Sequence, residues 1–527
     1  MAATTGFLGT NLVRDLANVI YGIGTLTAGQ VLAVNGAGTT IESVSPAGLG
    51  NEVCVPGDYA SVNAALTAGE KNICVLSTYV GTETADWPVS DGVSIRGQTQ
   101  ISTNVDLGGN DVHINALAGT VYSTGTITLT DADATVTGAG TAFLANVSAG
   151  QTLKVGCEYL TVASITNDTT LELATAYNGT TTAGLSYEVF SPINFHIRDL
   201  HFTGGNITTT PFLDCTAAGD QVIIERCTFS NFQLSERLIE FSLRGIRPQI
   251  YSCRINDCTF SPEHYCVAAT PEVCALVVRD THIRNIEGGR GFLGEGIFCH
   301  FDNCSVTNAL RGYSLDVSGS TYAHRASLTS CLADRCVDVG FETGGDDSHV
   351  VFTGCTAKNG DGFAARGGAG VSQYEALVYL GCLADNCTGS GFGLGQHSAS
   401  YTRCTAINNT DSGFFFSAAT SFNRGRVSIT SCVSSGNGAH GIHVEATDNT
   451  KLIIGDCQLE DNTGDAIVLS GTKTTVDNCD ISGSATNGVI QSDIGTGNHT
   501  IVRGCRIEGF TNAVNDAGSH VVVTDVF

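Results

Sequence analysis

Short runs of alternating apolar and polar residues recur along most of the chain, for example VVFTGCTA, KLIIGDCQL and HTIVRGCRI. Alternation with a period of two is typical of β-strands, whose successive side chains point to opposite faces. Asn, Asp and Gly separate the runs, and these residues accept turn and left-handed backbone conformations. The pattern predicts many short strands joined by tight turns.

A column of cysteines gives these strands a repeat. Cysteines recur about 25 residues apart, with Thr281 filling one long gap and Leu200 extending the series upstream. A period of this length corresponds to one coil of a solenoid. The column consists of Cys227, Cys253, Cys304, Cys331, Cys355, Cys382, Cys404, Cys432, Cys457, Cys479 and Cys505.

Two further columns keep the same register. An Asn follows the cysteine by four or five residues, and a Gly followed by an apolar residue comes seven to ten residues after it, as at Gly362-Phe363 and Gly413-Phe414. We therefore predict an all-β parallel β-helix with three strands per coil, an inward cysteine stack and an amide ladder at one turn. The amide column consists of Asn231, Asn285, Asn308, Asn359, Asn386, Asn408, Asn437 and Asn462.

The 21 cysteines are interpreted as structural thiols rather than disulfides or metal ligands. Their number is odd, and a chain of this length needs no disulfide staples. Cys258, Cys336 and Cys387 follow column cysteines by five residues, a spacing that is not usual for zinc. We interpret them as substitutes in or beside the Asn column, and we expect no metal and no cofactor.

Residues 47–116 read as strand, helix, strand, with an apolar stripe on the helix formed by Ala60, Val62, Ala65 and Leu66. This segment resembles the cap and first coils of pectate-lyase-like right-handed β-helices, in which a helix covers the open end of the core. A solenoid needs such a cap because its terminal coil otherwise exposes apolar surface.

Residues 117–190 break the repeat, alternate cleanly and turn at Ala-Gly, Asn-Asp and Asn-Gly. They resemble a small all-β module found inserted in phage structural proteins, and the main β-helix is expected over 191–527. Within residues 1–46, GTLTAGQVLAVNGAGTTIESVSP resembles a segment near the N-termini of bacteriophage tail fibres and tailspikes. The resemblance implies a short virion-attachment segment there.

Composition and charge exclude some classes of protein and of binding partner. Charged residues make up 14% and hydrophobic residues 42% of the chain, which excludes a disordered protein. The net charge of −26 argues against nucleic acid and against anionic lipid as partners. The uncharged run 16–41 is rich in Gly, Thr and Asn, so we expect no membrane insertion, and Arg14 and Asp15 argue against a cleavable signal.

Tailspike depolymerases, polygalacturonases and pectate lyases of this shape place carboxylates on an outer face, about 4.8 Å apart in adjacent coils. A search for acids in neighbouring repeats gives Asp316, Glu342, Asp346 and Asp347 as catalytic candidates. The alternative is that these are solvated acids on an acidic rod. The Asn-Thr-Asp and Arg-x-Lys motifs of polygalacturonases do not occur here, so no catalytic role is carried over from that family.

Loops of variable length around residues 366–426 carry candidate residues for sugar binding, with ordinary surface side chains as the alternative. These candidates are Tyr374, Glu375, His397, Tyr401, Phe415 and Phe422. His440 and His443 flank a glycine, but Glu445 is the one carboxylate at ligand spacing, so metal binding is not favoured.

Three functions fit these observations. We favour a phage tailspike or tail fibre that recognises host-surface polysaccharide, located in the virion and assembled in the reducing host cytoplasm, where free cysteines persist. The resemblance implies a homotrimer bound to other virion proteins through its N-terminus. The alternatives are a polysaccharide depolymerase, either glycoside hydrolase or lyase, and a capsid decoration or spike protein. Whether the chain is an enzyme stays open at this point.

Overall fold

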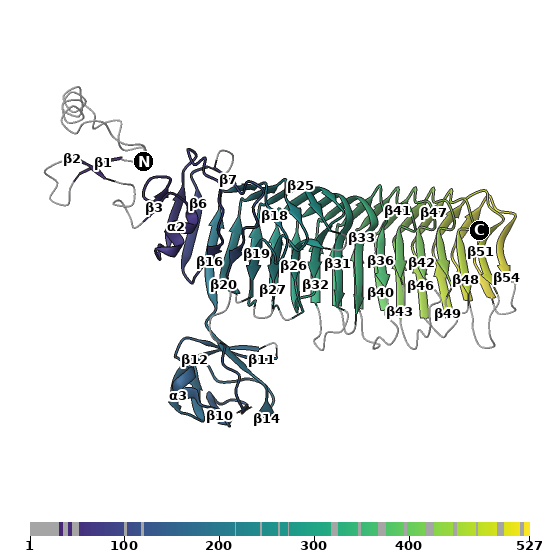
Figure 1. Ribbon diagram of the computed structural model, residues 1–527. Coiled ribbons are helices and arrows are strands. Elements are labelled where there is room, and N and C mark those ends of the chain that lie inside the picture. Colours follow the sequence, from purple (N-terminus) through teal and green to yellow (C-terminus); the bar gives the residue numbers. More distant parts are fainter. Residues whose placement is uncertain are drawn as a thin grey trace, which may run out of the picture.

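The strands stack into one long rod with a smaller lobe beside its N-terminal part (Figure 1). The computed structural model describes residues 31–34, 41–44, 52–99, 103–116, 121–156, 158–216, 218–242, 245–261, 264–271, 273, 275–317, 325–345, 349–366, 376–394, 398–416, 426–445, 451–470, 473–492, 500–516 and 521–527. The prediction of a parallel β-helix with a capping helix and an inserted β module is confirmed.

The rod consists of three parallel ladders, to which each coil contributes one strand. The first ladder is β3 (Val53–Val55), β4 (Asn72–Val75), β6 (Val93–Gly97), β16 (Ile193–Arg198), β20 (Ala218–Glu225), β24 (Gln249–Tyr251), β27 (Ala275–Arg279), β30 (Phe298–Asp302), β32 (Arg325–Thr329), β34 (His349–Thr353), β37 (Ala376–Leu380), β40 (Ser398–Thr402), β43 (Arg426–Thr430), β46 (Lys451–Gly455), β49 (Lys473–Asp477), β52 (Thr500–Arg503) and β55 (Val521–Thr524).

Two long strands, β31 (Ser305–Val317) and β33 (Leu332–Gly345), run through both the second and the third ladder, whereas β25 (Arg254–Phe260) and β28 (His282–Glu287) belong to the second ladder alone. The second ladder also contains β7 (Asn104–Asp106), β17 (His201–Thr203), β21 (Thr228–Ser230), β35 (Thr356–Lys358), β38 (Leu383–Asp385), β41 (Thr405–Ile407), β44 (Val433–Ser435), β47 (Gln458–Glu460), β50 (Asp480–Ser482) and β53 (Arg506–Glu508). The third ladder also contains β5 (Trp87–Pro88), β8 (Ile114–Asn115), β19 (Leu213–Cys215), β23 (Ile239–Phe241), β26 (Tyr265–Ala269), β29 (Arg290–Gly294), β36 (Phe363–Arg366), β39 (Phe392–Leu394), β42 (Phe414–Phe416), β45 (Ile442–Val444), β48 (Ile467–Ser470), β51 (Asn487–Ser492) and β54 (Asn512–Asp516). β18 (Asn206–Ile207) and β22 (Gln233–Leu234) form a short extra pair.

The cysteine column lies in the core, as predicted. Its thiols are buried and donate to carbonyl groups of the preceding coil, for example from Cys382 Sγ to Phe352 O at 3.6 Å. Thr281 occupies the gap in the column, where its hydroxyl donates to Arg279 O at 3.0 Å. Every cysteine that the structure describes is a free thiol, so the column stabilises the rod by packing rather than by cross-links.

Aromatic side chains fill the rest of the core in stacks that run from coil to coil. The column that follows the recurring glycine contains Phe341, Phe363 and Phe392, with ring centroids 4.7 and 4.8 Å apart and rings nearly parallel. A second stack on the first ladder joins Tyr379 to Tyr401 at 4.6 Å. Tyr401 is 0% exposed, so the prediction that it contacts glycan is wrong: it fills the core.

The predicted amide column is in fact two columns. Asparagines four residues after the cysteine, such as Asn359 and Asn386, adopt positive φ and link their side chains, with Asn386 Nδ2 donating to Asn359 Oδ1 at 2.9 Å. Asparagines five residues after it, such as Asn437 and Asn462, point inward and are joined at 2.8 Å. Cys387 belongs to this inner column, because its backbone N–H donates to Asn409 Oδ1.

A short helix, α2 (Val62–Thr67), caps the first coil. Ser61 is its N-cap and accepts a hydrogen bond from the Ala64 N–H, which satisfies one of the free donors of the first turn. Val62, Ala65 and Leu66 are buried as predicted. Ala60 precedes the helix and is exposed, so it is not part of the apolar stripe.

The inserted module is a seven-stranded antiparallel sheet that leaves the rod between β8 and β16 (Figure 1). Its strands are β9 (Thr126–Leu129), β10 (Thr135–Ala139), β11 (Thr152–Val155), β12 (Glu158–Asn167), β13 (Thr170–Leu173), β14 (Thr182–Leu185) and β15 (Glu188–Phe190), with one helical turn, α3 (Phe143–Asn146). Phe143, Leu153 and Leu171 lie in a core of its own.

At the N-terminus, β1 (Val31–Val34) and β2 (Ile41–Val44) pair as an antiparallel hairpin within the predicted attachment segment. The rest of residues 1–46 lies outside the described residues. None of the helices in the described ranges is long and apolar enough to cross a membrane. The domain boundaries at 46, 116 and 190 stay predictions.

Candidate functional site

The outer face of the third ladder carries a column of side chains in register from coil to coil. Each member lies between two core-facing residues of its strand, and neighbouring members are about 4.8 Å apart along the rod. The column consists of Asn115, Asp214, Glu240, Ala268, Leu293, Ser314, Glu342, Ala364, Gly393, Phe415, His443 and Val468.

Two carboxyl groups of this column face each other across one coil. Asp214 on β19 pairs in register with Glu240 on β23. Burial raises the pKa of Asp214 to about 6, and the charge of Glu240 adds to the effect. Glu240 instead accepts a hydrogen bond from Arg237 Nη1 at 2.5 Å. The pair therefore combines a carboxyl group that holds its proton in weak acid with one that is bound to a cation, and such unequal pairs are suited to acid–base chemistry.

His113 lies beside this pair in the coil before it. Its Nε2 is 3.0 Å from Asp111 Oδ1, and its Nδ1 is 3.1 Å from the carbonyl oxygen of Pro211. The imidazole is buried, and its charge acts on Asp214 in the opposite direction to burial by lowering the pKa of that carboxyl group.

Glu342, a predicted catalytic acid, lies in the same column but is 2% exposed. It accepts from Arg311 Nη1 at 2.6 Å and from Ser314 Oγ at 3.2 Å, and Arg311 also binds Asp338 at 2.5 Å. The prediction that Glu342 faces solvent is therefore wrong. Alternation does place Glu342 outside the core, but its carboxylate is covered and forms an ion pair with Arg311.

The other catalytic candidates are less closely defined. The backbone of Asp316 pairs with Gly344, two positions along from the Ser314–Glu342 pair, so Asp316 and Glu342 do not face each other. The side chain of Asp316 and the whole of Asp346 and Asp347 lie outside what the structure describes. Their catalytic role stays a prediction.

Among the predicted glycan-binding residues, Phe415 lies on the outer face and is half-buried. Its ring centroid is 5.3 Å from that of His443, which is in turn 4.9 Å from that of His440. Burial, together with the charge of His440, lowers the pKa of His443, while Glu445, 3.7 Å from its Nε2, acts in the opposite direction. Tyr374, Glu375, His397 and Phe422 lie outside the described residues.

Asp214 and Glu240 were not among the residues singled out from sequence, although a signal exists. LDC at 213–215 and IEF at 239–241 place an acid between two core residues in neighbouring repeats, 14 residues after Leu200 and 13 residues after Cys227. We predicted catalytic residues within 316–347 instead, because acidic residues are most closely spaced there. Within the described ranges, no group of three His, Cys, Asp or Glu side chains is arranged to hold a metal ion.

Comparison with known proteins agrees with the fold. The family model described as a right handed beta helix region matches residues 274–453. The A-module of a mannuronan C-5 epimerase from Azotobacter vinelandii is 16% identical, with a TM-score of 0.40 over 62% of this chain and 90% of that one. No curated protein matches the chain.

Two phage proteins are similar to the chain at the same low level. The tailspike protein gp49 from Pseudomonas phage LKA1 is 13% identical, with a TM-score of 0.36 over 87% of this chain and 77% of that one. The gp54 tailspike of Acinetobacter baumannii bacteriophage AP22, solved with a capsular saccharide, is 13% identical, with a TM-score of 0.27 over 82% and 76%.

Proposed function

We propose that this chain is a tailspike or tail fibre of a phage virion and that it recognises a polysaccharide of the host surface. The observation that carries the proposal is the register of the outer column, which presents Asp214 and Glu240 near one end and Phe415 and His443 near the other. Carboxylates accept hydrogen bonds from sugar hydroxyls, and aromatic rings pack on apolar sugar faces. Because the outer face presents one side chain per coil at a regular spacing, it suits a polymer whose sugar units also recur at a regular spacing.

The virion part of the proposal rests on the N-terminal segment that resembles those of phage fibres, within which a hairpin forms. The buried free thiols are consistent with assembly in a reducing cytoplasm. We further propose a homotrimer that binds other virion proteins through residues 1–46. Light scattering tests this state: a trimer gives about 164 kDa, three times the 54.6 kDa of the chain, and a native mass near 54.6 kDa refutes it.

An array of bacterial capsular and O-antigen polysaccharides tests recognition. The wild-type protein is expected to bind at least one of them, and Phe415→Ala is expected to weaken that binding about tenfold because it removes the half-buried ring on the outer face. Ile453→Ala is the matched control, since Ile453 is an exposed apolar residue on the first ladder. Equal losses in the two variants, or no bound polysaccharide, would reject the third ladder as the binding face.

Cleavage of the bound polysaccharide is the second candidate, and the Asp214–Glu240 pair favours it. Retaining glycosidases hold their carboxyl groups about 5 Å apart, which is close to the separation of one coil. Asp214 would donate its proton to the glycosidic oxygen as the leaving group departs, and Glu240 would bond to the anomeric carbon. Water then releases the sugar while Asp214 recovers its proton.

A reducing-end assay on the polysaccharide found by the array tests this chemistry. Asp214→Asn and Glu240→Gln are each expected to lower the rate by at least about a hundredfold, since each removes one of the two reacting groups. Asp302→Asn, on the outer face of the first ladder, is the control. If the wild type binds but releases no reducing ends, the chain is a binder and the acid pair serves recognition.

A further inference from the structure

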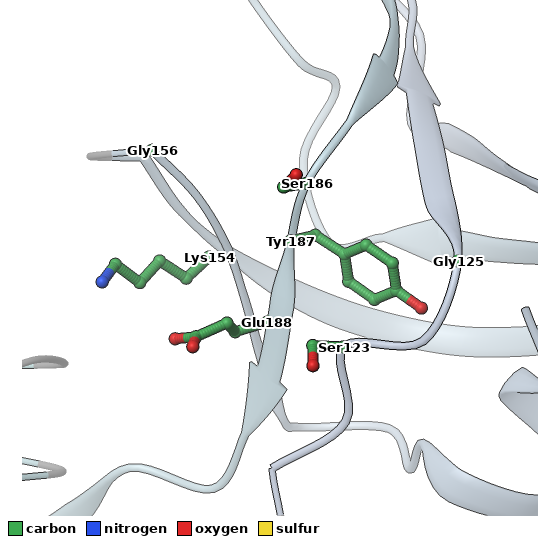
Figure 2. A pocket seen from close by; sticks show the side chains of 7 residues that line it. All are labelled: Ser123, Gly125, Lys154, Gly156, Ser186, Tyr187 and Glu188. Atoms are coloured by element: carbon green, nitrogen blue, oxygen red, sulfur yellow. The ribbon is translucent and has the colours of Figure 1, made fainter.

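The inserted module has a pocket of its own at the edge of its sheet (Figure 2). Its volume is about 440 Å³, which lies within the range of small-molecule sites. The pocket is lined by Ser123, Gly125, Lys154, Gly156, Ser186, Tyr187 and Glu188. None of these residues belongs to the outer column of the third ladder.

Lys154 and Glu188 provide the charges of the pocket. They are register partners on β11 and on the edge strand β15, next to Leu153 and Val189, whose side chains lie in the module core. Alternation therefore turns Lys154 and Glu188 to the opposite face. Figure 2 shows their side chains extending to the same side, while the Tyr187 ring projects the other way.

The lysine is unusually well covered for its type. Lys154 is 8% exposed, and lysine side chains are seldom buried to this extent. Lys154 also pairs in register with Tyr159 of β12, so its strand has a neighbour on each side. A lysine covered to this extent has lost rotamer freedom before a ligand binds, which reduces the entropy that a ligand contact costs.

Backbone forms the facing wall of the pocket. The Tyr187 hydroxyl donates to Thr124 O at 2.6 Å and holds the segment that carries Ser123 and Gly125. Gly125 has φ +86, and a Cβ there would lie 2.5 Å from Ala139 O, so this position accepts only glycine. Ser123 and Ser186 also line the pocket.

The donor and acceptor set selects the ligand. An ammonium group only donates hydrogen bonds, a carboxylate only accepts them, and a serine hydroxyl does both. One cation and one anion leave no net charge to attract an ionic ligand. Two neighbouring hydroxyls of a sugar ring match the pair, because one can donate to Glu188 while the next accepts from Lys154.

We propose that the inserted module binds an uncharged saccharide residue in this pocket. This site is separate from the third ladder and does not depend on the function proposed for it. It would give the protein a second point of contact with glycan, and two linked contacts on one chain bind more tightly than either alone.

Saturation-transfer NMR on the full-length protein tests the site, with glucose, galactose and N-acetylglucosamine as probes. The wild type is expected to transfer magnetisation to the ring protons of at least one sugar. Lys154→Met keeps the apolar stem and Glu188→Gln keeps the shape, and each is expected to weaken binding about tenfold or more because a charged hydrogen-bond partner is lost. Glu172→Gln on β13 of the same sheet and Ile453→Ala on the rod are expected to bind like the wild type.

Acetylation footprinting of the wild type gives a second measurement that needs no variant. The bound sugar is expected to protect Lys154 from labelling and to leave the exposed Lys451 unchanged. Absence of transfer to all three sugars overturns the proposal, as does binding that survives both pocket variants or leaves Lys154 unprotected. Loss of binding in Phe415→Ala alone assigns the sugar to the third ladder and also overturns it.

Discussion

Replacement of Glu342 by Gln separates a structural role from a catalytic one. Glu342 is an acid of the outer column that we predicted to be catalytic because acidic residues cluster around it in the sequence. In the structure it is covered and bound to Arg311. Glu342→Gln preserves the shape and one oxygen but removes the charge. We expect the variant to loosen β31 and β33 while it still binds polysaccharide as well as the wild type does.

The size of the effect follows from the contacts. A hydrogen bond to a charged group contributes about 1.5–3 kcal/mol, and loss of one partner of a buried ion pair costs about 3–5 kcal/mol when the other charge is left alone. Arg311 keeps Asp338 in the variant, so its charge is not left alone. The lower range applies, and we expect about 2 kcal/mol, which is roughly a 30-fold rise in the opening equilibrium.

Hydrogen exchange measured by mass spectrometry reads this opening strand by strand. Peptides from β31 and β33 should exchange roughly 30-fold faster in Glu342→Gln, and peptides from β46 and β49 should not change. Glu508→Gln is the control, because Glu508 forms an exposed pair with Arg506 and is expected to have no measurable effect. Unchanged protection of β31 in Glu342→Gln, together with lost polysaccharide cleavage, would refute the structural role and restore the catalytic one.

Three further predictions concern pH, thiols and the core. If the chain cleaves polysaccharide, its rate should fall as pH rises through about 6, because Asp214 then loses the proton it must donate; a rate that is flat from pH 5 to 8 contradicts this. Burial raises the pKa of the Cys336 and Cys387 thiols to about 12, so iodoacetamide should label them in denaturant and not in the native protein, as peptide mapping would report. Phe363→Ala should destabilise its coils by about 3–5 kcal/mol, seen as faster exchange in β33, β36 and β39, whereas Phe363→Leu should cost less.

Chemical repeats made the rod predictable from sequence. A buried thiol in most coils and an apolar, often aromatic, residue after the column glycine are strong signals, because stacking forces like residues onto like. The amide column was less clear, because a shift of one residue separates Asn359, which has a positive φ, from the inner Asn437. The number of residues after the cysteine, four for the outer asparagines and five for the inner ones, distinguishes the two columns.

The site was harder to predict, for a physical reason. Function on a solenoid depends on side chains one coil apart in space and about 25 residues apart in sequence, so local clusters of acids mislead. Asp214 and Glu240 are solitary acids in their own coils and become a pair through register alone. Coverage also cannot be read from alternation: Glu342 and Asp214 occupy equivalent positions, yet Glu342 is sealed in an ion pair while Asp214 keeps partial access to solvent.

The inserted module leaves and re-enters the rod at a single point. Tyr122 and Val189 exchange backbone hydrogen bonds of 2.9 and 2.8 Å, so the incoming and outgoing segments lie side by side. The coils before and after it stack directly, with β6 paired to β16. Replacement of this lobe by another would therefore leave the register of every coil unchanged. If its pocket binds sugar as proposed, an exchanged lobe would bring a different sugar specificity to an unaltered rod.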